Sequence, residues 1–202
     1  MSDLNPEGVN VNNLIFPFLK ETYKFQTTPS PNEFPDPNNS AKFKNGEFRV
    51  DDDGHPIIIN LTIHNDGLVA DTISSTLNSE KFLEDLYIRF SEVLKMPSLQ
   101  SLLRKKLYLS ELYVTIDKEL DLINPKLKLI SEYLSNTVEQ RDWAFRFGGV
   151  SFCVDPIKKF VPTPFRFERA IEVPFKENRY YSIAPLPTEK HLELLDKLEN
   201  LY

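Results

Sequence analysis

The stretch that most constrains the fold is residues 142–155, DWAFRFGGVSFCVD, in which two alternating runs flank the glycine pair 148–149. Alternation of apolar and polar residues is typical of a half-buried strand, and a glycine pair between two such runs predicts a two-residue hairpin turn. In that hairpin Phe145 faces Phe152, and the large apolar side chains share one face. We therefore expect this hairpin to form the centre of the core.

Other segments of the chain repeat the same two patterns. Apolar residues at intervals of three and four predict amphipathic helices, and short alternating runs between turn residues predict strands. The expected helices are residues 79–95, 124–136 and 188–201, and the expected strands are residues 47–50, 56–64, 68–73, 107–117, 165–169 and 178–184. The spacing lacks a regular βαβ repeat, so we expect an α+β fold with a mainly antiparallel, hairpin-rich β-sheet and about three helices packed against it.

Residues 1–45 differ in composition from the rest of the 202-residue chain. The segment Thr27–Ser40 is punctuated by proline, which excludes a helix or a central strand there and predicts a surface loop. Before it, residues 14–25 are rich in apolar and aromatic side chains, which predicts a segment tied onto the body. We therefore interpret residues 1–45 as an N-terminal arm packed on the body and residues 46–202 as a single α+β domain.

The charge balance and the cysteine count restrict the class of protein. A formal net charge of −6 makes nucleic acid an unlikely partner, because such binding depends on many lysines and arginines that neutralise phosphates. The single cysteine, Cys153, excludes an intramolecular disulfide. The N-terminal residues show no basic start followed by an apolar segment, and no apolar run approaches the length that spans a bilayer. We therefore expect a soluble, acidic, cytoplasmic protein without a membrane partner.

Standard catalytic and cofactor motifs are missing from the sequence. Its six glycines form no phosphate-binding loop and no dinucleotide fingerprint, and there is neither a GxSxG elbow nor an HExxH zinc motif. The histidines His55, His64 and His191 are scattered, and we interpret them as ordinary surface residues. Cys153 is interpreted as a small packing residue of its strand rather than a nucleophile. The sequence thus predicts no catalytic residue, no metal ligand and no cofactor.

Asp71 is the most unusual charge in the chain. A three-residue turn at residues 65–67 would place Leu61 opposite Asp71 and leave this carboxylate on the apolar face, where an unpaired charge is costly. Asp71 then either binds backbone amides of the turn that follows, or serves with Asp117 and a histidine such as His64 as a metal ligand or general base.

The candidate binding face comes from pairing the strands 165–169 and 178–184. With Arg169 opposite Asn178, Glu168 lies across from Arg179 and Arg166 across from Tyr181. Alternation then puts the phenylalanines of the first strand toward the core and leaves four side chains together on the other face: Arg166, Glu168, Arg179 and Tyr181. This face is either a solvated surface whose charges hold the register, or a contact patch for an acidic partner surface.

Three functions remain open on these grounds. The first is a non-catalytic intracellular interaction protein, such as an accessory, inhibitor or immunity-type factor, that binds another macromolecule; the expected partner is a protein. It rests on the missing catalytic motifs and on arginine and tyrosine at a strand face, which are residue types enriched at binding hot spots. The alternatives are a metal-dependent hydrolase that uses Asp71 and Asp117 with a histidine, and a self-assembling structural component that forms a homo-oligomer.

Overall fold

A computed structural model describes residues 12–30, 40–51, 54–64, 66–95, 103–122, 124–138, 144–155 and 161–200. The chain divides into two compact units, residues 1–106 and residues 107–202. This division falls inside the range 46–202 for which the sequence predicts one domain, and the predicted arm belongs to the first unit.

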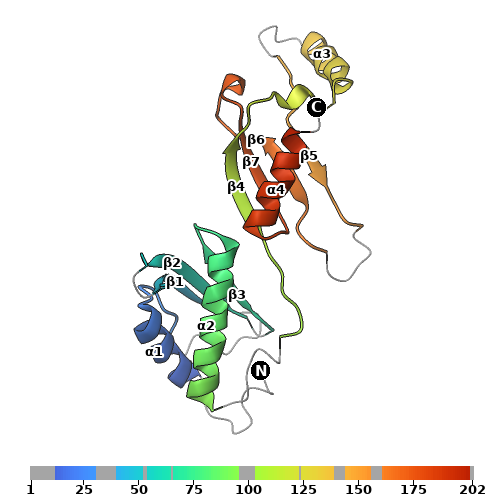
Figure 1. The fold of residues 1–202 in the computed structure, drawn as a ribbon. Coiled ribbons are helices and arrows are strands. Elements are labelled where there is room, and N and C mark those ends of the chain that lie inside the picture. The colour runs from blue at the N-terminus through green and yellow to red at the C-terminus, as the bar shows by residue number, and fades with distance from the viewer. Residues whose placement is uncertain are drawn as a thin grey trace. The chain divides into compact units, whose positions relative to one another are not determined.

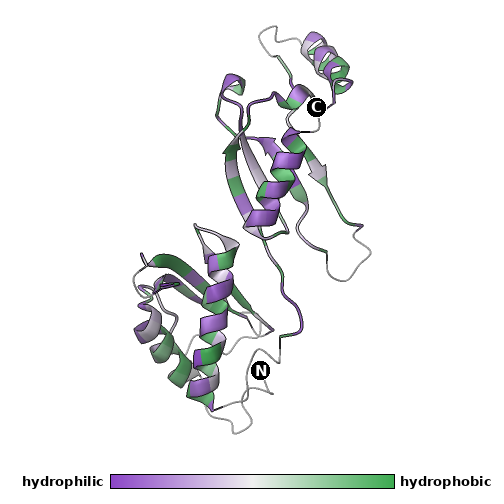
Figure 2. Cartoon of the chain, in the orientation of Figure 1, coloured by the Kyte–Doolittle hydropathy of each residue, from purple (hydrophilic) through white to green (hydrophobic). Residues whose placement is uncertain are grey.

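The first unit combines two helices with one antiparallel sheet (Figure 1). The helices are α1 (Asn12–Tyr23) and α2 (Thr76–Leu94), and the strands are β1 (Ala41–Phe48), β2 (Ile57–Ile63) and β3 (Leu68–Thr72), in the order β1-β2-β3. In Figure 2, α2 alternates between hydrophilic and hydrophobic bands, as expected of a helix with one face on a sheet.

Side chains of both helices and of the sheet form the core of the first unit. Phe16 and Leu19 of α1, and Phe25 just after that helix, are buried. They pack against Phe43 of β1 and Phe82 of α2. The aromatic rings meet mainly edge to face or tilted, and edge to face is a favoured geometry of aromatic pairs; the ring centres of Phe16 and Phe43 are 5.1 Å apart. Side chains of the segment 14–25 are therefore part of the core of the first unit. The prolines at 31–39 lie outside the described residues.

The second unit contains a four-stranded antiparallel sheet in the order β4-β7-β6-β5. Its elements are β4 (Ser110–Thr115), the 3-10 turn η4 (Leu120–Leu122), α3 (Leu127–Thr137), β5 (Gly149–Phe152), β6 (Phe165–Arg169), the 3-10 turn η5 (Phe175–Glu177), β7 (Arg179–Ala184) and α4 (Thr188–Glu199). Helix α4 lies over the sheet (Figure 1) and packs Leu195 and Leu198 against Phe165, Phe167 and Tyr180. One face of this sheet is therefore the core of the unit.

The predicted fold class is confirmed. The described residues form four α-helices and two antiparallel sheets, of three and four strands, which is an α+β fold. Neighbouring strands are mostly close in sequence, but β4 pairs with β7 across more than 60 residues of chain. That pairing brings residues together that no local pattern connects.

The predicted central hairpin is wrong. Residues 144–148 form no strand, and β5 pairs with β6 instead, with Phe152 opposite Phe165. Phe145 is 38% exposed and Phe152 is 65% exposed, so neither forms the centre of the core. Gly149 is needed for a different reason: a β-carbon there would lie 2.5 Å from the carbonyl oxygen of Phe167. Only glycine lets the β5 backbone approach β6 so closely.

Helix α3 also departs from its expected packing. The sequence predicts that Leu127, Ile130 and Leu134 point inward, but Ile130 is 57% exposed and Leu134 is 40% exposed. The least exposed side of the helix instead carries Leu127, Ser131 and Ser135, and Ser135 accepts a hydrogen bond from the backbone of Phe145 at 2.8 Å. None of the described α3 side chains is buried.

Candidate functional site

The four predicted site residues lie on one face of the second unit's sheet, opposite the face that α4 covers. Arg166 and Glu168 alternate on β6 with the buried Phe165 and Phe167, and Arg179 and Tyr181 alternate on β7 with the buried Tyr180 and Ser182. This alternation is the period of two that a strand imposes on its side chains. We call the face of the sheet that points away from α4 the outer face.

The register between β6 and β7 differs from the predicted one. Glu168 lies opposite Tyr181 and Arg166 lies opposite Ile183. The predicted direct pairs, Glu168 with Arg179 and Arg166 with Tyr181, are therefore wrong. The shift is two residues, and because the side-chain period is also two, every residue stays on its predicted face.

The sheet registers arrange the outer face in rows that run across the strands. One row holds Tyr113, Tyr181 and Glu168, since Tyr113 on β4 lies opposite Tyr181. The rings of Tyr113 and Tyr181 are 5.3 Å apart between centres and are tilted by 51°. The next row holds Glu111, Ile183, Arg166 and Ser151, and Arg179 lies on the other side of the tyrosine row. An aromatic and aliphatic centre thus has charges of both signs around it.

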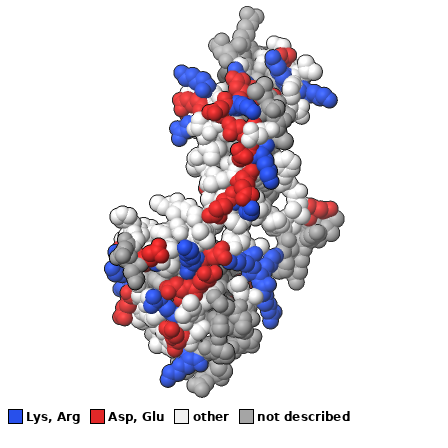
Figure 3. Space-filling view, viewed as in Figure 1, with Lys and Arg blue, Asp and Glu red and all other residues white. Residues whose placement is uncertain are grey.

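Exposure and charge leave this face available for contact. Tyr113 is 74% exposed, and Arg166, Glu168 and Arg179 are all exposed. Within the described part of the chain, neither arginine belongs to an ion pair. On the opposite, α4 side of this unit, which is the side that Figure 3 shows, acidic and basic side chains are interspersed.

Tyr181 is held in place by its neighbours. Partial burial raises its pKa, and the nearby Glu111 carboxylate, which accepts a hydrogen bond from the hydroxyl, raises it further. Tyr181 is therefore protonated at neutral pH.

A depression of about 710 Å³ borders the outer face at β5 and β6. Its lining includes Arg166 and Glu168 of the face together with Arg169, Ile171 and Phe175. The Arg169 guanidinium lies 4.6 Å from the centre of the Phe175 ring, in cation–π contact, and its Nε donates to the carbonyl of Phe147 at 3.3 Å. Its buried Nη2 has no hydrogen-bond partner among the described residues.

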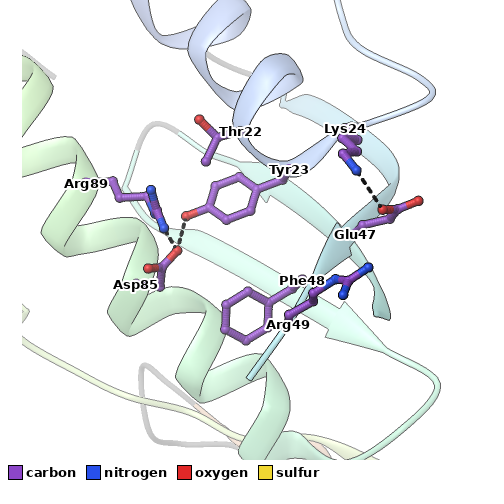
Figure 4. Close-up of a pocket in the computed structure, with 8 residues that line it drawn as sticks. All are labelled: Thr22, Tyr23, Lys24, Glu47, Phe48, Arg49, Asp85 and Arg89. Atoms are coloured by element: carbon purple, nitrogen blue, oxygen red, sulfur yellow. Dashed lines mark hydrogen bonds and ion pairs between the residues drawn. The ribbon is translucent and has the colours of Figure 1, made fainter. Parts of the chain in front are cut away.

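A second pocket, of about 220 Å³, lies in the first unit (Figure 4). The Tyr23 hydroxyl donates to the Asp85 carboxylate at 2.7 Å, and Arg89 Nε donates to the same oxygen at 2.8 Å. Burial, followed by the bond to Asp85, raises the pKa of Tyr23 far above its usual range. Lys24 is paired in turn with Glu47 at 3.4 Å. These contacts tie α1 to α2 and to β1, so the pocket is explained by packing.

No protein-family model, curated protein or solved structure matches this chain.

Asp71 does not lie on the apolar face as predicted. The observed register places it opposite Asn60, whose amide donates to the Asp71 carboxylate at 2.8 Å, while Ala70 faces Leu61. Asp117 lies in the other compact unit. Among the described residues, no three His, Cys, Asp or Glu side chains gather as a group that could hold a metal ion. The hydrolase hypothesis stays an untested prediction.

His191 is wrongly predicted as a surface residue, because this α4 side chain is fully buried between the helix and the sheet. Its Nδ1 is 2.7 Å from the hydroxyl of Ser110, and its Nε2 is 2.7 Å from the hydroxyl of Ser182, which itself donates to the Arg166 carbonyl at 2.9 Å. Burial lowers the pKa of His191, so the ring is neutral and ties α4 to β4 and β7.

The cysteine and the basic side chains of the sequence do not gather at one site among the described residues. Cys153 is exposed, with its Sγ 3.8 Å from Ser151 Oγ. Arg146, which precedes β5, pairs with Glu119 at 3.7 Å. Lys106, from the basic run at 104–106, pairs with Glu80 of α2. None of the described helices is both long and apolar enough to cross a membrane.

Sequence reasoning missed Tyr113, although a signal for it existed. Leu112 and Val114 are apolar, so alternation in 107–117 already puts Tyr113 on the opposite face. What no local pattern contains is the pairing of β4 with β7, which brings Tyr113 against Tyr181.

Proposed function

We propose that this protein is a non-catalytic interaction protein that binds a partner protein through the outer face of the second unit's sheet. The observation that carries the proposal is a sheet face of exposed arginine and tyrosine that α4 does not cover, since α4 packs on the opposite face. Tyrosine and arginine are among the residues that dominate binding free energy at interfaces. In the cell, we place this activity in the cytoplasm, as an accessory, inhibitor or immunity-type factor.

The roles of the individual side chains follow from their positions. Tyr113 and Tyr181 supply flat apolar area at a small cost in side-chain entropy, because their rings already contact each other. Arg166 and Arg179 lie on either side of the tyrosine row and can each take a carboxylate of an acidic partner surface in a forked hydrogen bond. Glu168, beside Tyr181, opposes acidic groups in that row and so helps to set the orientation of the partner.

The test is capture of a partner by the full-length chain. Immobilised wild-type protein is compared with the double variant Arg166→Glu/Arg179→Glu in lysate of the source cells. The control is Lys190→Glu/Lys197→Glu, which makes the same change in net charge on the exposed side of α4.

The proposal expects a protein that the wild type and the control retain and the double variant loses. Circular dichroism and thermal melts confirm that all three chains are folded. Equal capture by the folded double variant would refute the proposed face.

A further inference from the structure

Strand β4 is an edge of the four-stranded sheet, and among the described residues it pairs with β7 alone. The Ile116 amide donates to the Asn178 carbonyl at 3.2 Å, just past the end of the strand. In an antiparallel ladder the backbone groups of successive residues point to opposite sides. Glu111, Tyr113 and Thr115 therefore direct their N–H and C=O groups away from β7, toward the free edge.

This edge lacks most of the usual protections against pairing with another strand, and its one charged side chain is Glu111. Natural sheet edges are blunted by lysine, proline, bulges or short length. β4 is six residues long, contains neither lysine nor proline, and pairs with β7 without a break in register. The other edge of the same sheet, β5, has four residues and begins at Gly149. An open row of backbone donors and acceptors selects one kind of occupant, which is another strand.

We propose that β4 pairs antiparallel with β4 of a second copy of this chain, about a two-fold axis at Tyr113. Only residues that point to the free edge can exchange hydrogen bonds, so Tyr113 meets Tyr113 of the second copy and Glu111 meets Thr115. On the α4 side of the sheet, Leu112 then lies beside Val114 of the second copy. No like charges face each other, and the strand is complementary to itself in this register.

Apolar side chains flank the free edge on both faces of the sheet. On the outer face, Tyr113 is 74% exposed. On the other face, Leu192 of α4 is 49% exposed. Leu192 lies on the side of α4 that adjoins β4: Glu199, seven residues later on the same side, accepts a hydrogen bond from the Asp117 amide at 2.9 Å. Strand pairing would cover both side chains as well as the edge. It shares Tyr113 with the proposed partner face but uses neither Arg166 nor Arg179, and it goes beyond the proposed function by assigning the edge of β4 to a second copy of this chain.

The first test is charge exchange at the two-fold axis, followed by sedimentation velocity of the full-length chain over a range of concentrations. Wild-type protein is expected to form a dimer. Tyr113→Lys and Tyr113→Glu each place two like charges on the axis, so each variant alone should show at least a tenfold larger dissociation constant. A mixture of the two places opposite charges there and should restore the dimer. Because the Tyr113 side chain is exposed, both variants should melt as the wild type does at a concentration at which the wild-type dimer is dissociated.

The second test is a cross-link in a Cys153→Ser background, which removes the single native cysteine. Tyr113→Cys should give a disulfide-linked dimer, because residues in a hydrogen-bonded antiparallel pair have α-carbons about 5.5 Å apart, within disulfide range. Thr115→Cys is the matched control. Position 115 faces Glu111 of the second copy, and position 115 of the second copy lies four residues further along that strand, about 13 Å away, which is too far for a disulfide.

Three results would overturn the proposal. One is a wild-type chain that stays monomeric at every accessible concentration. That result would mean that the β4 edge is left free, or is covered by another part of the same chain or by a different protein. Another is a dimer that is indifferent to the charge at position 113. The third is equal cross-linking of Tyr113→Cys and Thr115→Cys, which would contradict the register.

Discussion

The side-chain amide of Asn60 donates a 2.8 Å hydrogen bond to the carboxylate of Asp71, its direct partner across β2 and β3. This pair is exposed, and its residues belong to the face of the sheet that points away from the core. The charge that looked misplaced in the sequence is therefore a cross-strand polar pair.

Asp71→Ala removes that hydrogen bond and should lower the free energy of unfolding by only about 0.5–1.5 kcal/mol, since both groups can be hydrated. Asp71→Asn keeps an acceptor and should cost less. Urea denaturation of the two variants measures the difference. A loss of several kcal/mol, or a metal-dependent thermal shift that disappears in Asp71→Asn, would instead support the hydrolase hypothesis.

Gly149→Ala should destabilise the second unit by about 1–3 kcal/mol, the usual cost of overpacking. The added β-carbon would lie 2.5 Å from the Phe167 carbonyl oxygen and 2.8 Å from the α-carbon of Glu168. Gly148→Ala is the matched control, because nothing lies within 4 Å of a β-carbon at that position. Thermal melts compare the two, and equal melting temperatures would contradict the observed β5–β6 contact.

Phe167→Ala should cost about 3–5 kcal/mol, the range for emptying a buried aromatic site. Phe167 is 1% exposed and stacks on Tyr180, with ring centres 4.7 Å apart. Phe152→Ala should cost far less, because Phe152 is 65% exposed. Chemical denaturation of both variants distinguishes this core from the predicted hairpin core, in which Phe152 would be the more damaging site.

His191 should make the second unit sensitive to acid. Burial lowers its pKa below the ordinary value near 6.5, so below that pH the unfolded chain binds a proton that the folded chain resists. The contribution of His191 to stability is complete above about pH 6.5 and is lost as the pH falls toward the lowered value. Urea unfolding of wild type and His191→Gln between pH 5 and 8 tests this. The wild type should lose more stability below about pH 6.5 than the variant, and parallel pH profiles would refute the assignment.

The two register errors show what the sequence could and could not predict. Between β2 and β3 the observed register is offset by one residue from the predicted one, with the His64 amide bonded to the Gly67 carbonyl, and that single-residue offset places Asp71 on the other face. Between β6 and β7 the error was two residues, so Arg166 kept its face. Alternation predicts faces well, but register depends on turn geometry that local sequence determines weakly.

The errors in the core have a different physical origin. The glycine pair was interpreted as a turn because glycine suits tight turns, whereas Gly149 serves a close approach between two backbones. His191 was assigned to the surface because its hydrogen-bond partners, Ser110 and Ser182, are distant in sequence or on another element. Both depend on tertiary contacts that no window of sequence contains.

The affinity of the captured partner for the double variant Arg166→Glu/Arg179→Glu, measured by calorimetry with purified proteins, tests the central claim most directly. Binding through the outer face predicts a loss of about 2 kcal/mol or more, roughly a 30-fold larger dissociation constant, while Lys190→Glu/Lys197→Glu binds as the wild type does. An unchanged dissociation constant in a folded double variant would show that the partner binds elsewhere.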